Sequence, residues 1–63
     1  MENWSKKELE IIELIESKSD AELEHLRIMT KAELEKGNTS MSFAFDRICR
    51  EMAKRTVAAI MEL

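Results

Sequence analysis

The chain has 63 residues, a formal net charge of -3 and a single cysteine, Cys49. A chain of this length makes one domain at most, and a lone cysteine excludes both an internal disulfide and a zinc site of the usual Cys/His type. The small net charge also argues against a chain that binds nucleic acid or membranes over its whole surface.

Helix-forming residues dominate the composition. The chain has no proline, one glycine (Gly37), one tryptophan and two phenylalanines, which favours helices over sheets. The sequence therefore predicts an all-α fold in which residues 1–63 form a single helical domain. No apolar run is long enough to cross a membrane and the first residues do not resemble an export signal, so we expect a cytoplasmic protein that does not contact membranes.

The first predicted helix covers about residues 5–36. It opens with a capping box, in which Ser5 and Glu8 each bond the backbone N–H of the other, and Trp4 is placed to pack against Leu9. Apolar positions then recur in steps of three and four, which predicts one buried face along the helix. This face carries Ile12, Ile15, Ser19, Leu23, Leu26, Thr30 and Leu34.

The segment Ser17–Asp20 allows a second interpretation of this helix. Ser19 and Glu22 have the spacing of another capping box, which would end one helix and begin the next. Against a break, the apolar face continues through Ser19 in phase, and neither glycine nor proline interrupts the segment. We therefore predict one continuous helix, with a break near Ser17–Asp20 as the alternative.

A turn at residues 37–40 separates this helix from a second one at about residues 41–63. Gly37 has the position of a left-handed helix cap, and the hydroxyl of Thr39, Ser40 or Ser42 can cap the next helix. The second helix also carries one apolar face at helical spacing. This face is formed by Phe45, Ile48, Cys49, Met52, Thr56, Ala59, Ile60 and Leu63.

The two predicted helices differ in length, and this difference predicts a dimer. Folded antiparallel about Gly37, a first helix of about 48 Å overhangs a second one of about 35 Å by about 13 Å. The overhang, residues 4–13, carries apolar side chains that a second hairpin would cover, and two-fold pairing of hairpins makes a four-helix bundle. We expect the dimer interface to comprise Trp4, Leu9, Ile12, Ile15, Leu23, Leu26, Phe45, Met52 and Ile60.

The far side of the second helix carries cations and apolar side chains together. Such a mixture is not typical of a solvated face and indicates a surface for a larger protein partner. Apolar groups there would provide burial, and the cations would orient the partner. We expect the partner-binding residues to be Phe43, Arg47, Arg50, Lys54, Val57 and Met61.

Two other kinds of function stay open. The cationic row Arg47, Arg50 and Lys54 could contact the phosphates of a nucleic acid, on a helical-bundle dimer. A lesser alternative is a di-metal carboxylate site. Glu22 and His25 match the Glu-x-x-His pattern of di-iron bundles, and Glu51 would lie at about the same level.

The sequence carries no catalytic set. His25 and Cys49 could approach one another across the turn, but Cys49 falls on the apolar face, where a thiol normally acts as a small inert side chain. We therefore expect a non-enzymatic regulatory or adaptor protein of bacterial or phage type. It would need no cofactor and would act by protein–protein interaction as a homo-oligomer.

Overall fold

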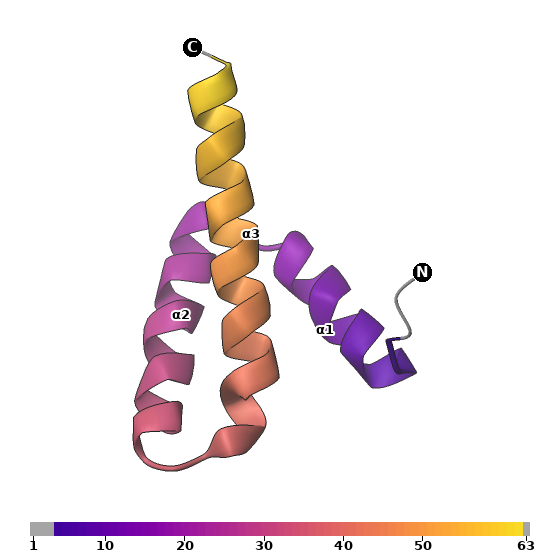
Figure 1. Ribbon diagram of the computed structural model, residues 1–63, viewed down its shortest axis with the longest axis vertical. Helices are drawn as coiled ribbons and strands as arrows, with labels where there is room; N and C mark the ends of the chain where they lie inside the picture. Colours follow the sequence, from indigo (N-terminus) through magenta and orange to yellow (C-terminus); the bar gives the residue numbers. More distant parts are fainter. Residues whose placement is uncertain (1–3, 63) are drawn as a thin grey trace.

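The computed structural model describes residues 4–62, which form three α-helices and one short 3-10 helix (Figure 1). Helix α1 covers Lys6–Glu16, α2 covers Asp20–Glu35, the 3-10 helix η1 covers Thr39–Met41 and α3 covers Ser42–Met61. No strand occurs within residues 4–62. The all-α prediction is therefore confirmed. The predicted end of the second helix at Leu63 lies outside the described residues.

Helix α1 begins at the predicted capping box. The Ser5 hydroxyl accepts a hydrogen bond from the Glu8 backbone N–H at 3.1 Å, and the Ser5 N–H donates to the Glu8 carboxylate at 2.9 Å. These two bonds satisfy N–H groups that no helical carbonyl can reach. The helix ends at Glu16, and the Ser17 hydroxyl donates to the Leu14 carbonyl at 2.7 Å.

The prediction of one continuous helix over residues 5–36 is wrong. Ser19 has an extended backbone (φ -72°, ψ 165°), and its hydroxyl accepts from the Glu22 N–H at 3.2 Å while its own N–H donates to the Glu22 carboxylate at 3.0 Å. This second capping box satisfies the amide groups that a new helix start exposes, so the break costs little. The alternative interpretation, a break near Ser17–Asp20, is the one observed.

Helix α2 ends at the predicted glycine. Gly37 has φ 97°, a left-handed conformation that a side chain would strain. The Gly37 N–H donates to the Leu34 carbonyl at 2.9 Å and the Asn38 N–H donates to the Glu33 carbonyl at 3.0 Å, the pattern of a Schellman cap. The chain then passes through η1 into α3, and no side chain caps the start of α3.

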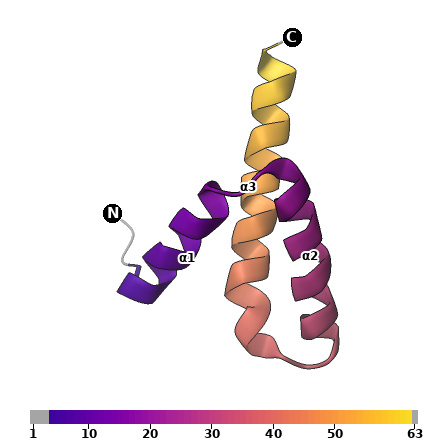
Figure 2. The same cartoon turned by 180° about the vertical axis from the view of Figure 1, so that it is seen from behind.

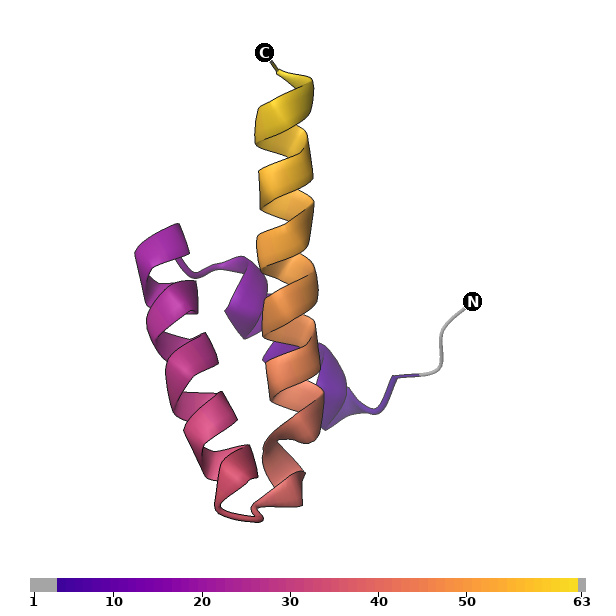
Figure 3. The ribbon, with the colours of Figure 1, turned by 60° about the vertical axis from the view of Figure 1, so that its left-hand side comes forward.

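Helix α3 is the central element of the molecule. Helix α2 runs antiparallel beside it, and α1 packs on another side of its first half (Figures 1 and 2). In Figure 3 α1 crosses behind α3, whereas α2 lies to the left of α3. The break at Ser17–Asp20 makes this arrangement possible, because it lets α1 turn back across α3.

Each helix contributes one residue to the core. Ile15 of α1, Leu23 of α2 and Ile48 of α3 are 5%, 0% and 2% exposed. They are the only hydrophobic side chains in the described part of the chain that are fully buried. Partly buried hydrophobic residues packed against this cluster are Ile11, Leu26 and Met52.

The molecule is open for its size. Its radius of gyration is 12.6 Å, whereas a compact domain of 63 residues is expected near 10.6 Å. Its accessible surface is 5018 Å², whereas a compact monomer of this mass is expected to expose about 4200 Å².

The overhang lies at the opposite place from the one predicted. Residues 4–13 do not extend past the second helix, because α1 folds against α3. Trp4 packs against Phe43 of α3, and Leu9, its predicted partner, is 45% exposed. The projecting segment is instead the C-terminal third of α3, which extends beyond the other two helices (Figure 1).

Candidate interaction surface

The projecting end of α3 consists of six uncharged residues, Thr56–Met61, and all six are exposed. Val57, Ile60 and Met61 are 55%, 62% and 81% exposed. Because 100° separates successive residues around a helix, these side chains point in all directions from the axis. A helical segment that is apolar on every side is normally buried. We call Thr56–Met61 the α3 tail.

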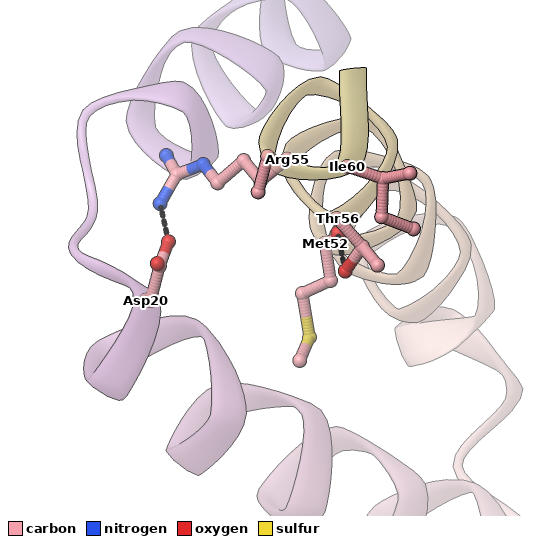
Figure 4. Close-up of a pocket in the computed structure, with 6 residues that line it drawn as sticks. Asp20, Met52, Arg55, Thr56 and Ile60 are labelled. Atoms are coloured by element: carbon pink, nitrogen blue, oxygen red, sulfur yellow. Dashed lines mark hydrogen bonds and ion pairs between the residues drawn. The ribbon is translucent and has the colours of Figure 1, made fainter. Parts of the chain in front are cut away.

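A hollow of about 480 Å³ lies beside the α3 tail (Figure 4). Met52 extends from α3 into the space between this helix and α2, and the hydroxyl of Thr56 donates to the Met52 carbonyl at 3.0 Å. Because that hydroxyl is satisfied within its own helix, the hollow presents a mainly apolar wall. The residues that line it are Asp20, Met52, Arg55, Thr56, Ala59 and Ile60.

Arg55 forms one end of this hollow and joins all three helices. Its guanidinium donates to the Asp20 carboxylate at 2.7 Å, to the Glu51 carboxylate at 2.9 Å and to the Glu16 backbone carbonyl at 3.2 Å. The Asp20 hydrogen bond, followed by the one to Glu51, raises the pKa of Arg55. The Glu16 carbonyl belongs to the last turn of α1, where a cation is favourable for the helix dipole.

The sequence held a signal for this contact that the prediction did not use. Folding the chain antiparallel about Gly37 places residue 25 near residues 51–52, and the same register places Asp20 opposite Thr56. Arg55 and Asp20 are therefore neighbours of opposite charge across the turn, and their ion pair could have been predicted from the sequence.

The predicted partner-binding residues fall into two groups. Phe43 and Arg47 are half-buried under Trp4: the Phe43 and Trp4 rings pack edge to face at 5.6 Å, and the Arg47 guanidinium lies 5.5 Å from the centre of the Trp4 ring. Within residues 4–62 the buried Nε of Arg47 has no hydrogen-bond acceptor. The chain's own N-terminal segment therefore covers part of Phe43 and Arg47, and their role in binding a partner stays a prediction.

The other four predicted partner-binding residues remain on the surface. Arg50 donates to Asp46 at 2.8 Å, and Lys54 lies 3.9 Å from Glu51 with 69% of its side chain exposed. Val57 and Met61 follow on the same side of α3, one and two turns further along. We call Arg50, Lys54, Val57 and Met61 the outer face.

The cationic row predicted for nucleic-acid binding is interrupted. Arg47 packs under Trp4 and Arg50 is paired with Asp46, so Lys54 is the most available of the three charges. A phosphate backbone is bound by several unpaired cations in a row, because each one releases a counterion. The geometry therefore offers little support for that alternative.

The predicted dimer-interface residues are also divided. Ile15 and Leu23 are used in the core of a single chain, and Leu26 and Met52 pack against them. Ile15 and Leu23 have almost no accessible surface in the single chain, so their place in a dimer interface stays a prediction. Trp4, Ile12 and Phe45 are half-buried, which leaves Leu9 and Ile60 as the most open members of the set.

The three residues considered for a di-metal site have other roles. The Glu22 carboxylate caps the start of α2, and its hydrogen bonds with Ser19 lower its pKa. The Glu51 carboxylate holds Arg55, and His25 lies on the exposed side of α2, beside a hollow of about 330 Å³. Over residues 4–62, no group of three or more His, Cys, Asp or Glu side chains is placed to hold a metal ion.

Comparison of the chain with protein-family models, with curated proteins and with solved structures finds no match. The function therefore has to be argued from the surface itself. None of the helices in residues 4–62 combines the length and the apolar character that crossing a bilayer requires.

Proposed function

We propose that this chain is a small regulatory or adaptor protein that acts by binding another protein and that works as a homo-oligomer. The observation that carries the proposal is the α3 tail, six consecutive uncharged residues that the chain itself leaves exposed on every side. Burying apolar surface is the main favourable term in protein association, at about 25 cal/mol for each Å².

The outer face has the composition of a protein-binding surface. Val57 and Met61 offer apolar area, and methionine adapts its shape to a partner's groove. Arg50 and Lys54 lie beside them at the rim, where charges contribute mainly to the rate and orientation of association. A larger protein with an apolar groove and a flanking acidic group would match this surface.

Affinity capture from the source organism tests the proposal. The tagged wild-type chain should retain a specific protein, and Met61→Asp should release it by placing a carboxylate in the apolar part of the contact. Met29→Asp is a matched control, because Met29 is also exposed (52%) but lies on α2. Equal capture by both variants and the wild type would show that the outer face does not bind the partner.

Salt dependence separates this proposal from nucleic-acid binding. Binding through apolar contacts should weaken little between about 50 and 200 mM salt, whereas binding through phosphates should weaken steeply. If the captured molecule is a nucleic acid and the double variant Arg50→Glu/Lys54→Glu releases it, the cationic alternative replaces the proposal.

A further inference from the structure

We infer that the hollow beside the α3 tail is filled by the α3 tail of a second copy, so that two chains pair through antiparallel ends of α3. This inference rests on the proposed function and names the oligomer contact within it. It differs from the dimer predicted from the sequence, which placed the uncovered segment at the start of the chain.

The first step of the argument is the continuity of one face of α3. Ile48 and Met52 lie on the side of α3 that packs against Leu23 of α2, and Phe45 shares their helical spacing. The same side continues as Thr56, Ala59 and Ile60. Helix α2 begins at Asp20, however, and cannot cover these last residues. The apolar face of α3 is thus longer than the helix that covers it.

The second step is the direction of the missing helix. Helix α2 is antiparallel to α3, and the α3 tail of a second copy in antiparallel orientation would run in the same direction as α2. It would continue the line of α2 past Asp20, with its C-terminal end facing the N-terminal end of α2. The dipoles of two helices meeting in this way attract one another.

The third step is charge complementarity. A two-fold axis through the middle of the α3 tail, between Ala58 and Ala59, places residue 55 of one copy opposite residue 62 of the other. Arg55 and Glu62 lie on the same flank of α3, about seven residues or two turns apart. Two-fold pairing therefore sets Arg55 of each copy beside the exposed Glu62 of the other. Three of the five N–H groups of Arg55 bond Asp20, Glu51 and the Glu16 carbonyl of its own chain, so two are left to donate to Glu62. Between these two pairs, the tail itself contains no charge that would repel its copy.

The fourth step is the amount of surface. The chain exposes 5018 Å², roughly 800 Å² more than a compact monomer of its mass. Part of this excess is the exposed apolar surface of the α3 tail, where Val57, Ile60 and Met61 are 55%, 62% and 81% exposed.

A pair of neighbouring substitutions tests the inference. The wild-type chain should show about twice its 7.3 kDa mass by light scattering at micromolar concentration. Ile60→Asp, on the side of the hollow, should raise the dissociation constant by about 100-fold or more, because the carboxylate would be buried without a partner. Met61→Asp, on the outer face, should leave the dimer intact.

Both variants should fold, because their own chain does not cover residues 60 and 61. Circular dichroism at a concentration where the wild type is diluted to monomer checks this directly. A wild-type chain that is monomeric at about 100 μM, or a dimer that Ile60→Asp leaves unchanged, would overturn the inference.

Disulfide trapping locates the contact independently. In a Cys49→Ala background, Ala59→Cys should give a cross-linked dimer on mild oxidation, since residue 59 lies next to the two-fold axis. Ala53→Cys is the matched control, also exposed and also on α3. Its two copies would lie roughly 15 Å apart along the helices. A cross-link at residue 53 with none at residue 59 would place the interface elsewhere.

The results also separate this inference from the proposed function. A dimer that uses another contact, with capture of a partner still lost in Met61→Asp, overturns the inference alone. A dimer trapped at residue 59 that captures no protein overturns the adaptor function and leaves the pairing of α3 tails established.

Discussion

The two ends of α3 carry similar apolar faces but differ in burial. In its first half, Ile48 is 2% exposed because Ile15 and Leu23 close over it from two sides. In its last two turns, Ile60 is 62% exposed because neither α1 nor α2 reaches that far. Both are isoleucines on a helix whose sequence pattern predicts burial. The exposure of these two isoleucines is therefore decided by whether a neighbouring helix extends to their level of α3, and not by the local composition.

Arg55 marks the border between these two regions. On one side its guanidinium ties the α1–α2 junction to α3 through Asp20 and the Glu16 carbonyl, and on the other side it lines the hollow beside the α3 tail. The first region should therefore respond to substitutions as the core of a folded monomer does. Substitutions in the α3 tail should change the association with a second molecule and leave the stability of the single chain unchanged.

The largest expected effect is in the core. Leu23→Ala should lower the free energy of unfolding by about 3 kcal/mol, because it removes a fully buried side chain and leaves a cavity. In a domain this small, such a loss is a large share of the whole free energy of unfolding. Urea titration followed by circular dichroism measures it.

Leu14→Ala is the matched control for the core substitution. Leu14 is 57% exposed, so its truncation should change the free energy of unfolding by less than about 0.5 kcal/mol. Similar losses in both variants would mean that the Ile15, Leu23 and Ile48 cluster is not the core of the fold.

Removing the contact at the border should have the next largest effect. Arg55→Met keeps much of the length of the side chain but ends its hydrogen bonds to Asp20, Glu51 and Glu16, so α1 should loosen from α3. Hydrogen exchange should show faster exchange of α1 amides than of α2 amides. Arg50→Met removes an exposed pair within one helix and should cost no more than about 0.5 kcal/mol. Unchanged exchange in α1 would argue against the role given to Arg55.

A smaller effect is expected at the break between α1 and α2. Ser19→Ala removes the hydroxyl that caps α2 and should lower the free energy of unfolding by about 1 kcal/mol. Ser17→Ala, two residues earlier, removes only a bond to the Leu14 carbonyl and should cost less. If Ser19→Ala instead stabilised the chain, a continuous helix over residues 5–36 would be the better description of this segment.

The helices themselves were largely predictable from the sequence, because their ends are marked by local chemistry. Ser5 with Glu8 and Gly37 are sequence signals that the structure uses as expected. The break at Ser19 was also marked, by its spacing to Glu22. It was outweighed by the phase of the apolar face, which runs on because a break of three polar residues need not disturb the pattern on either side.

The packing of the helices was less predictable. Nothing in the spacing of Trp4 says that its ring lies on Phe43 and Arg47, since the direction of α1 depends on backbone angles at Ser17–Ser19. Because the direction of α1 was not predicted, the overhang was expected at the first helix and not at the end of α3. For the same reason, Phe43 and Arg47 were expected on an open surface. Which of the predicted surface residues the chain itself covers depends on the path of α1, and the spacing of the residues does not give that path.

The smallest expected effect is a dependence of helix stability on acid. Hydrogen bonds with Ser19 lower the pKa of Glu22 from its ordinary value of 4.5, the Arg27 guanidinium lowers that of Glu24, and Lys36, followed by Asn38, lowers that of Glu33. A carboxyl whose pKa is lower in the folded chain contributes stability above 4.5 and loses it as the pH falls through the folded value. All three residues lie on α2.

Acid should therefore loosen α2 progressively below pH 4.5, even though the core that holds α2 contains no carboxyl group. Glu22→Gln tests one contribution, because the amide can still accept a bond from the Ser19 N–H but no longer titrates. Its free energy of unfolding, measured by urea titration between pH 7 and pH 3, should change less with pH than that of the wild type. Glu10→Gln, on α1, should follow the wild type. If Glu22→Gln and the wild type lost stability in parallel, the acid sensitivity would come from other carboxyl groups, and the cap at Ser19 would act through its hydrogen bonds alone.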